Sequence, residues 1–140
     1  MNDEQATFRV FISHSTVDTW VAKQIATAVE ACGATTFLDE ANIEYGDDFE
    51  AKILEAARGA DELLVLLTPW ATQRPYIWME IGAFWGAGKR IVGVLQGLTA
   101  EELATRKEIP ALLKRTVLLE SNDLDQYFPQ LAGRVQAKKK

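Results

Sequence analysis

The sequence predicts an α/β fold in which helices cover both faces of a parallel sheet. Short segments rich in apolar and β-branched residues alternate with segments whose apolar residues have helical spacing. One short segment, Leu63–Leu67, is apolar at every position, which is typical of a strand buried on both faces. Strands that alternate with helices favour parallel pairing through right-handed crossovers, so we expect a three-layer sandwich.

The N-terminal elements follow from local composition. Phe8–Ile12 is expected to be the first strand, because it is rich in aromatic and β-branched residues and precedes the polar cluster Ser13–Thr16. Apolar residues then recur at helical spacing between Val17 and Val29. This helix is expected to end at Cys32–Gly33, where glycine can adopt the left-handed cap conformation.

The middle of the chain continues the alternation. Thr35–Leu38 is expected to be the second strand, and the polar run 39–47 the loop after it. A short helix around Ile53–Ala57 is closed by Gly59, and the third strand, Leu63–Leu67, then ends before Thr68-Pro69.

Pro75 suits the first turn of a third helix, which Gly86–Lys89 is expected to close. Arg90–Leu95 is expected to be the fourth strand, Val117–Leu119 a weaker fifth, and Leu124–Val135 the last helix.

Composition indicates one globular domain spanning residues 1–140, with its core at about 8–136. The net charge of −5 and the pI of 4.9 argue against nucleic acid or an anionic membrane as the main partner. One cysteine and one histidine exclude a disulfide framework and the usual zinc sites, so no metal is expected. The sequence has no apolar run of membrane-spanning length and no secretory signal, so we expect a cytoplasmic protein.

Glu80 is the only charged residue between Pro75 and Gly88. In a helix, Tyr76 and Phe84 would share its face, one turn to either side. A carboxylate framed by rings is poorly solvated, which suits it to meet a sugar that develops positive charge. The alternative is an ordinary, partly exposed glutamate whose neighbours belong to the core.

Ligands of parallel sheets bind at the carboxyl ends of the strands. That edge collects the polar segments 13–16, 39–47 and 68–76, and the helix that carries Glu80 follows the last of them.

Several common catalytic motifs do not fit the sequence. Gly86-Ala-Gly-Lys89 follows a helix and lacks the rest of a phosphate-binding loop, and no glycine-rich fingerprint follows the first strand. The third strand ends at Thr68, where a phosphate-accepting receiver would need an aspartate. No Gly-x-Ser-x-Gly elbow exists, and Cys32 has no histidine placed to activate it, so hydrolysis through a nucleophile is not expected.

Five sequence segments in order resemble the Toll/interleukin-1 receptor (TIR) domain in its bacterial form. They are Phe11-Ile-Ser-His14, Phe37-Leu-Asp39, Ile43-Glu-Tyr-Gly-Asp47, Thr68-Pro69 and Glu80. The resemblance runs from about Phe8 to Leu119 and implies a flavodoxin-like fold with a five-stranded parallel sheet in the order 2-1-3-4-5.

The resemblance also implies an activity, because many bacterial members of this family cleave NAD⁺ at the nicotinamide–ribose bond. The catalytic glutamate of those members corresponds to Glu80. Tyr76 stands where the family often has tryptophan. NAD⁺ would be the substrate and no further cofactor would be needed, with water or a group of the same molecule as acceptor.

The resemblance extends to binding and assembly residues. The residues it implies at the substrate site are Phe11, His14, Ser15, Phe37, Trp70 and Tyr76. For Phe11 and Phe37 a place in the core is the alternative, and for Trp70 a lid over the core. The residues it implies in a loop that docks on a neighbouring domain are Asp39, Ile43, Tyr45, Gly46 and Asp47. A solvated connection is the alternative for that loop.

Three functions are compatible with these features. The first is an NAD⁺ nucleosidase or ADP-ribosyl cyclase, activated by self-assembly of TIR domains, in bacterial defence or signalling. The second is a non-catalytic TIR–TIR interaction module or a host-directed effector. The third is an enzyme that transfers ribosyl or deoxyribosyl groups between nucleosides, which would also place a glutamate at the anomeric carbon.

Overall fold

The computed structural model describes residues 7–38, 49–105 and 118–139. Five parallel strands form one sheet in the order β2-β1-β3-β4-β5, which confirms the order implied by the resemblance. The strands are β1 (Arg9–Ser13), β2 (Thr35–Leu38), β3 (Glu62–Leu67), β4 (Arg90–Leu95) and β5 (Leu119–Glu120).

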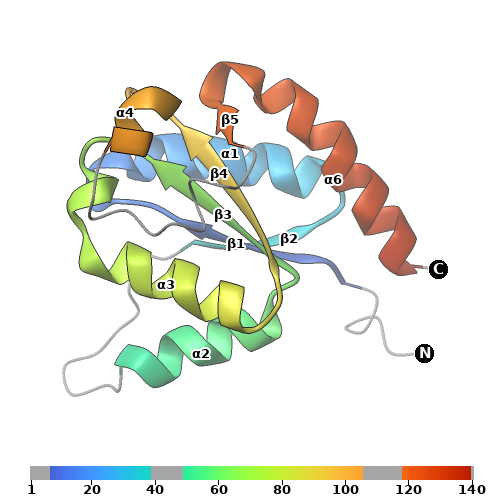
Figure 1. The fold of residues 1–140 in the computed structure, drawn as a ribbon. Coiled ribbons are helices and arrows are strands. Elements are labelled where there is room, and N and C mark those ends of the chain that lie inside the picture. Colours follow the sequence, from blue (N-terminus) through green and yellow to red (C-terminus); the bar gives the residue numbers. More distant parts are fainter. Residues whose placement is uncertain (1–6, 39–48, 106–117, 140) are drawn as a thin grey trace.

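Helices cover both faces of the sheet, as Figure 1 shows: α1 and α6 lie on one face, and α2 and α3 lie on the other. The helices are α1 (Thr19–Ala31), α2 (Phe49–Gly59), α3 (Pro75–Gly86), α4 (Ala100–Thr105) and α6 (Leu124–Lys139). Short 3-10 turns stand at η2 (Thr16–Asp18), η3 (Ala71–Gln73) and η4 (Ser121–Asp123). The expected three-layer α/β sandwich is therefore confirmed.

Most element ends agree with the sequence analysis. Gly33 and Gly88 have φ angles of 96° and 72°, so both expected helix caps use the left-handed conformation. β1 runs one residue further than expected and includes Ser13. The valine that was expected to begin the apolar stripe of the first helix, Val17, lies instead in η2 and is exposed. Residue 117 of the expected fifth strand lies outside the described residues.

The helix α4 is an element that the sequence analysis did not predict. Its N-terminus is a capping box in which the Thr99 hydroxyl accepts a hydrogen bond from the Glu102 backbone N–H at 3.0 Å. The Glu102 carboxylate in turn accepts from the Thr99 backbone N–H at 3.4 Å. The Thr-x-x-Glu pattern was therefore the sequence signal for this helix.

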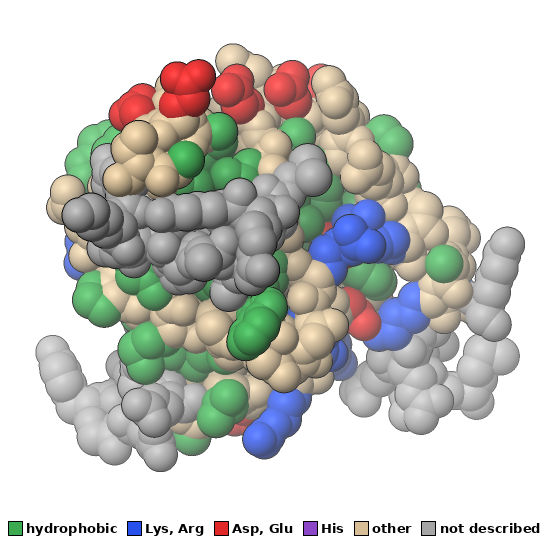
Figure 2. Space-filling view, in the orientation of Figure 1, with side chains coloured by type: hydrophobic (Ala, Val, Ile, Leu, Met, Phe, Trp, Pro, Cys, Tyr) green, Lys and Arg blue, Asp and Glu red, His purple; other side chains and the backbone are tan. Residues whose placement is uncertain are grey.

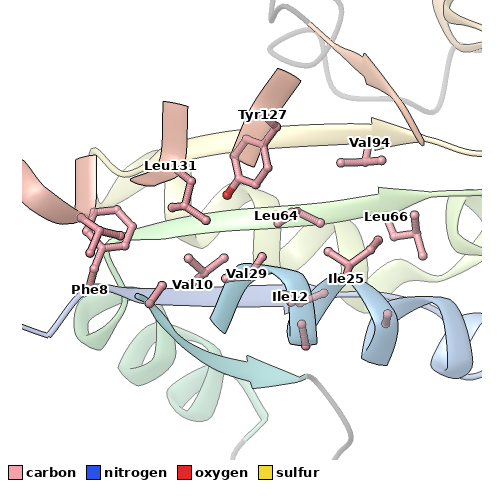
Figure 3. Packing of buried hydrophobic residues seen from close by; sticks show 14 residues of the cluster. Phe8, Val10, Ile12, Ile25, Val29, Leu64, Leu66, Val94, Tyr127 and Leu131 are labelled. Atoms are coloured by element: carbon pink, nitrogen blue, oxygen red, sulfur yellow. The ribbon is translucent and has the colours of Figure 1, made fainter. Parts of the chain in front are cut away.

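The central strands are buried on both faces because two hydrophobic clusters sandwich them. In β1, Val10 and Ile12 pack toward α1 and α6 (Figure 3), whereas Phe11 packs toward α2 and α3. In β3, Leu64 and Leu66 belong to the cluster on the side of α1 and α6, whereas Leu63, Val65 and Leu67 belong to the cluster on the side of α2 and α3. The unbroken apolar run of β3 is thus explained by helices above and below it.

The amino end of β3 carries a buried ionic cluster that anchors α6 to the sheet. The carboxylate of Glu62 accepts hydrogen bonds from the Tyr127 hydroxyl at 2.6 Å and from Arg134 Nε and Nη2 at 2.8 and 3.1 Å. Lys138 extends this anchor by donating to both carboxylate oxygens of Asp61, each at 2.9 Å. Burial, reinforced by the charge of Glu62 and its hydrogen bond, raises the pKa of Tyr127.

This cluster predicts a loss of stability at alkaline pH. The pKa of Tyr127 in the folded chain lies above its ordinary value of 10.0, so the unfolded chain loses the proton first as the pH rises. The free energy of unfolding is fully retained below about pH 10 and should then fall by about 1.4 kcal/mol per pH unit from this one group.

Denaturant unfolding of the wild type and Tyr127→Phe from about pH 8 to about pH 11 checks this expectation. The variant should be less stable at neutral pH but should show the smaller alkaline decline. Parallel curves for the two proteins would contradict the assignment, because the titration of all other groups is common to both.

Candidate functional site

Glu80 is a buried carboxylate at the carboxyl edge of the sheet. Glu80 is 1% exposed. This excludes the alternative interpretation of Glu80 as a partly exposed helix residue. The hydroxyl of Ser13, the last residue of β1, donates a hydrogen bond of 2.8 Å to Glu80 Oε1. Because side chains alternate along a strand, Ser13 points to the same side as Phe11, and that side is the one that α3 covers.

Two aromatic residues of α3 flank Glu80 at four-residue spacing, as the sequence indicated. The Tyr76 hydroxyl donates a hydrogen bond of 2.9 Å to the backbone carbonyl of His14. One turn beyond Glu80, the ring of Phe84 packs on Phe11 with centroids 5.4 Å apart. Contacts on both sides of Glu80 therefore connect α3 with β1 and the loop after it, and the carboxylate lies between them.

The loop after β1, which the sequence predicted to be a polar segment at the ligand edge, places His14 and Ser15 in the interior. The imidazole of His14 is buried, with Nε2 3.5 Å from the hydroxyl of Thr19. Among the described residues, His14 Nδ1 has no hydrogen-bond partner. The hydroxyl of Ser15 accepts a hydrogen bond from the Val17 backbone N–H at 3.3 Å and so caps η2.

A second hydrogen-bond pair, which sequence reasoning missed, connects the loops after β1 and β3. The hydroxyl of Thr68 donates to Asp18 Oδ2 at 2.6 Å and accepts from the Ala71 backbone N–H at 3.1 Å. Both Thr68 and Asp18 are buried. The Thr68-Pro69 pair at the strand end was noticed in the sequence, but its partner is 50 residues away.

The remaining residues implied at the substrate site divide between core and surface. Phe11 is in the core, stacked on Phe37 with centroids 5.2 Å and planes 26° apart. Phe37 itself is 54% exposed. A place in the core was the alternative for both rings, and only Phe11 has it. Trp70, at the start of η3, is 53% exposed. The implied docking-loop residues, from Asp39 to Asp47, lie outside the described residues.

Residues 7–38, 49–105 and 118–139 contain no group of three or more histidine, cysteine or acidic side chains that could hold a metal ion. In the same ranges, no helix has the length and apolar composition that a membrane crossing requires.

The Thr68 hydroxyl is expected to stabilise the edge on which the site lies. Thr68→Val keeps the shape of the side chain but leaves Asp18 without this donor and the Ala71 N–H without its acceptor. The free energy of unfolding should fall by about 1–3 kcal/mol. Thr68→Ser, which keeps the hydroxyl, should lose less in the same denaturant titration. A valine variant as stable as the wild type would contradict the role of this pair.

Comparison with known proteins identifies the family. Residues 10–129 match the TIR domain family. No curated protein matches the sequence significantly.

Three solved structures share the fold at low sequence identity. The TIR domain of the Toll-related receptor TRR-2 from Hydra magnipapillata has a TM-score of 0.66 and 19% identity, covering 93% of this chain and 99% of that one. A metazoan TIR-STING receptor from C. gigas has a TM-score of 0.61 and 19% identity, covering 94% of this chain and 40% of that one. The TIR domains of the activated Roq1 resistosome, which directly recognizes the pathogen effector XopQ, have a TM-score of 0.60 and 14% identity, covering 95% of this chain and 82% of that one. Because the family match spans most of the sequence and the solved TIR domains share its fold, the chain belongs to the TIR domain family.

Proposed function

We propose that this TIR domain cleaves NAD⁺ at the nicotinamide–ribose bond, with Glu80 as the catalytic carboxylate. The observation that carries the proposal is a buried glutamate oriented by Ser13 at the end of β1. The sheet order places β1 next to β3, so the chain changes direction across the sheet between these two strands. Ligands of open α/β sheets bind at this switch point, outside the carboxyl ends of the strands.

The chemistry needs one carboxylate. When the glycosidic C–N bond breaks, its electron pair stays with nicotinamide, which leaves as a neutral molecule, and positive charge develops on the ribose. The Glu80 carboxylate would stabilise that charge directly or through hydrogen bonds to the ribose hydroxyls. Water as acceptor gives ADP-ribose and a proton, whereas attack by a group of the same molecule gives a cyclic ADP-ribose and a proton.

Burial of Glu80 supports activation by a rearrangement. A carboxylate in a residue that is 1% exposed has to become accessible before the ribose can reach it. Self-assembly of TIR domains is the trigger that we propose, with the segment from Asp39 to Asp47 docking on a neighbouring domain. Activity should therefore rise more steeply than in proportion to protein concentration.

Substrate contacts are proposed for the residues implied by the resemblance. The exposed rings of Trp70 and Phe37 are available to stack on a base or on nicotinamide. Phe11 would support Phe37 from within the core. His14 and Ser15 would line the nucleotide site together with Tyr76, whose hydroxyl already bonds the loop that carries them.

The biological role proposed with this activity is bacterial defence or signalling in the cytoplasm. The reaction would deplete NAD⁺ or produce a cyclic messenger. Nucleic acid is not proposed as a partner. Figure 2 shows acidic side chains gathered along α4 and the start of α6, and these would repel a polyanion.

A non-catalytic TIR–TIR interaction module is the second candidate. Exposed large apolar side chains favour it, because aromatic residues are enriched where protein surfaces meet. Trp20 on α1 and Trp85 on α3 are both largely exposed, in addition to Trp70. Such a module would self-associate without consuming NAD⁺.

Removal of the Glu80 charge tests the enzymatic proposal. Glu80→Gln keeps the size of the side chain, so the fold should persist, but nicotinamide release from NAD⁺ should fall at least about a hundredfold. Chromatography with mass detection measures the release, and it separates ADP-ribose from a cyclic isomer that is lighter by one water.

The matched control is Glu55→Gln, which removes an exposed carboxylate from α2 and should turn over NAD⁺ like the wild type. NAD⁺ turnover by Glu80→Gln at the wild-type rate would contradict the assignment of Glu80 as the catalytic carboxylate. A folded wild type that releases no nicotinamide at any concentration yet self-associates would favour the interaction module. Exchange of bases between nucleosides without NAD⁺ turnover would instead point to a nucleoside transferase.

A further inference from the structure

We infer that the amino edge of the sheet is the surface on which the docking segment of a second copy of this chain binds. The segment from Asp39 to Asp47 was proposed above to dock on a neighbouring domain, but its receptor surface on that neighbour was not assigned. This contact would be the one through which the domains assemble, so it rests on the proposed function.

Positively charged side chains gather at the amino edge of the sheet. They come from the first residues of β1 and β4, from the ends of α2 and α6, and from the residue just before β4. Because the strands are parallel, all these positions lie at one end of the sheet. Figure 2 shows Lys and Arg side chains on the side of the molecule where α6 ends and β4 begins. We call the following five residues the basic edge: Arg9, Arg58, Lys89, Arg90 and Lys139.

The basic edge keeps its positive charge because the two acids at the start of β3 are already bonded to other cations. Asp61 is paired with Lys138 at 2.9 Å, and Glu62 is paired with Arg134 at 2.8 Å. Within residues 7–38, 49–105 and 118–139, no ion pair involves a residue of the basic edge. A surface of one sign whose nearby counter-charges are used attracts a partner of the opposite sign.

The docking segment has the complementary charge. Its nine residues contain no Lys or Arg, and four of them are acidic: Asp39, Glu40, Glu44 and Asp47. The segment leaves the end of β2 and leads to the start of α2, so both of its flanks are attached at the carboxyl edge of the sheet. A second copy stacked in the same direction therefore brings the acidic segment of one chain to the basic edge of the next.

A second copy fits the basic edge better than a polyanion does. The whole chain has a net charge of −5, which repels nucleic acid and anionic membranes. A copy of the chain, in contrast, supplies the acidic partner at a defined place. Because the contact joins two different surfaces, it can repeat from copy to copy and gives open rows rather than closed pairs.

Charge reversal on both surfaces tests the contact by sedimentation velocity. The edge variant carries Arg58→Glu and Lys89→Glu, which lie at the ends of the neighbouring helices α2 and α3. The segment variant carries Glu44→Lys and Asp47→Lys. Each variant alone opposes like charges, so the concentration at half association should rise at least about tenfold. A mixture of the two variants should associate again, because every contact between unlike copies then joins opposite charges.

The matched control reverses two cations that lie away from the basic edge. Lys23 and Lys52 are exposed in the first halves of α1 and α2, toward the carboxyl edge. The variant with Lys23→Glu and Lys52→Glu should associate like the wild type. Added salt should weaken association of the wild type, because it screens exposed charges. Melting temperatures verify that each variant is folded.

The outcomes separate this contact from the proposed catalysis. A wild type that is monomeric at every concentration, wild-type association by either variant alone, or a mixture that stays monomeric would overturn the docking contact. Binding of the wild type to anionic vesicles or to DNA without self-association would overturn it as well. Charge-dependent association without release of nicotinamide from NAD⁺ would support the contact and contradict the proposed enzymatic function.

Discussion

The candidate site depends on the parallel pairing of β1 with β3 at the centre of the sheet. This pairing runs in register from Val10 opposite Glu62 to Ser13 opposite Val65. The pairing brings together two strand ends that are far apart in the chain. The loops that follow these ends can therefore share the hydrogen bond between Thr68 and Asp18, which are 50 residues apart. The return of α3 across the same face then places Glu80 beside Ser13.

Two buried glutamates at opposite edges of the sheet make different contacts. At the amino end, Glu62 receives the guanidinium of Arg134 and the hydroxyl of Tyr127, which together anchor α6. Removing one partner of such a pair is costly because a buried charge is left behind, so these contacts hold α6 in place against β3. At the carboxyl edge of the sheet, Glu80 of α3 accepts a hydrogen bond from the hydroxyl of Ser13. A buried carboxylate held at this edge suits the chemistry that we propose for it.

The fold was predictable because its strongest signals are local. The unbroken apolar run of β3, Pro75 at the start of α3, and the glycines Gly33 and Gly88 each specify an element or its end from a few neighbouring residues. The sequence analysis missed α4, although its Thr-x-x-Glu capping box is present in the sequence. A six-residue helix has too few apolar positions to show helical periodicity.

The site was only partly predictable because its hydrogen bonds are non-local. Glu80 could be singled out as the lone charge in an apolar helix, and that property is visible in one segment. Ser13 could not, because the sequence placed it in a loop and its partner lies on another element. The burial of His14 likewise follows from how the loop after β1 packs. A single histidine among polar residues gives no sequence signal for this burial.

The measurement that tests the central claim most directly is a crystal structure of the Glu80→Gln variant with NAD⁺ bound. The account predicts that the anomeric carbon of the nicotinamide ribose lies roughly 3–4 Å from the side chain of residue 80, at the edge where β1 and β3 end. NAD⁺ bound with its ribose away from residue 80, or a saturated crystal with no NAD⁺ at that edge, would contradict it.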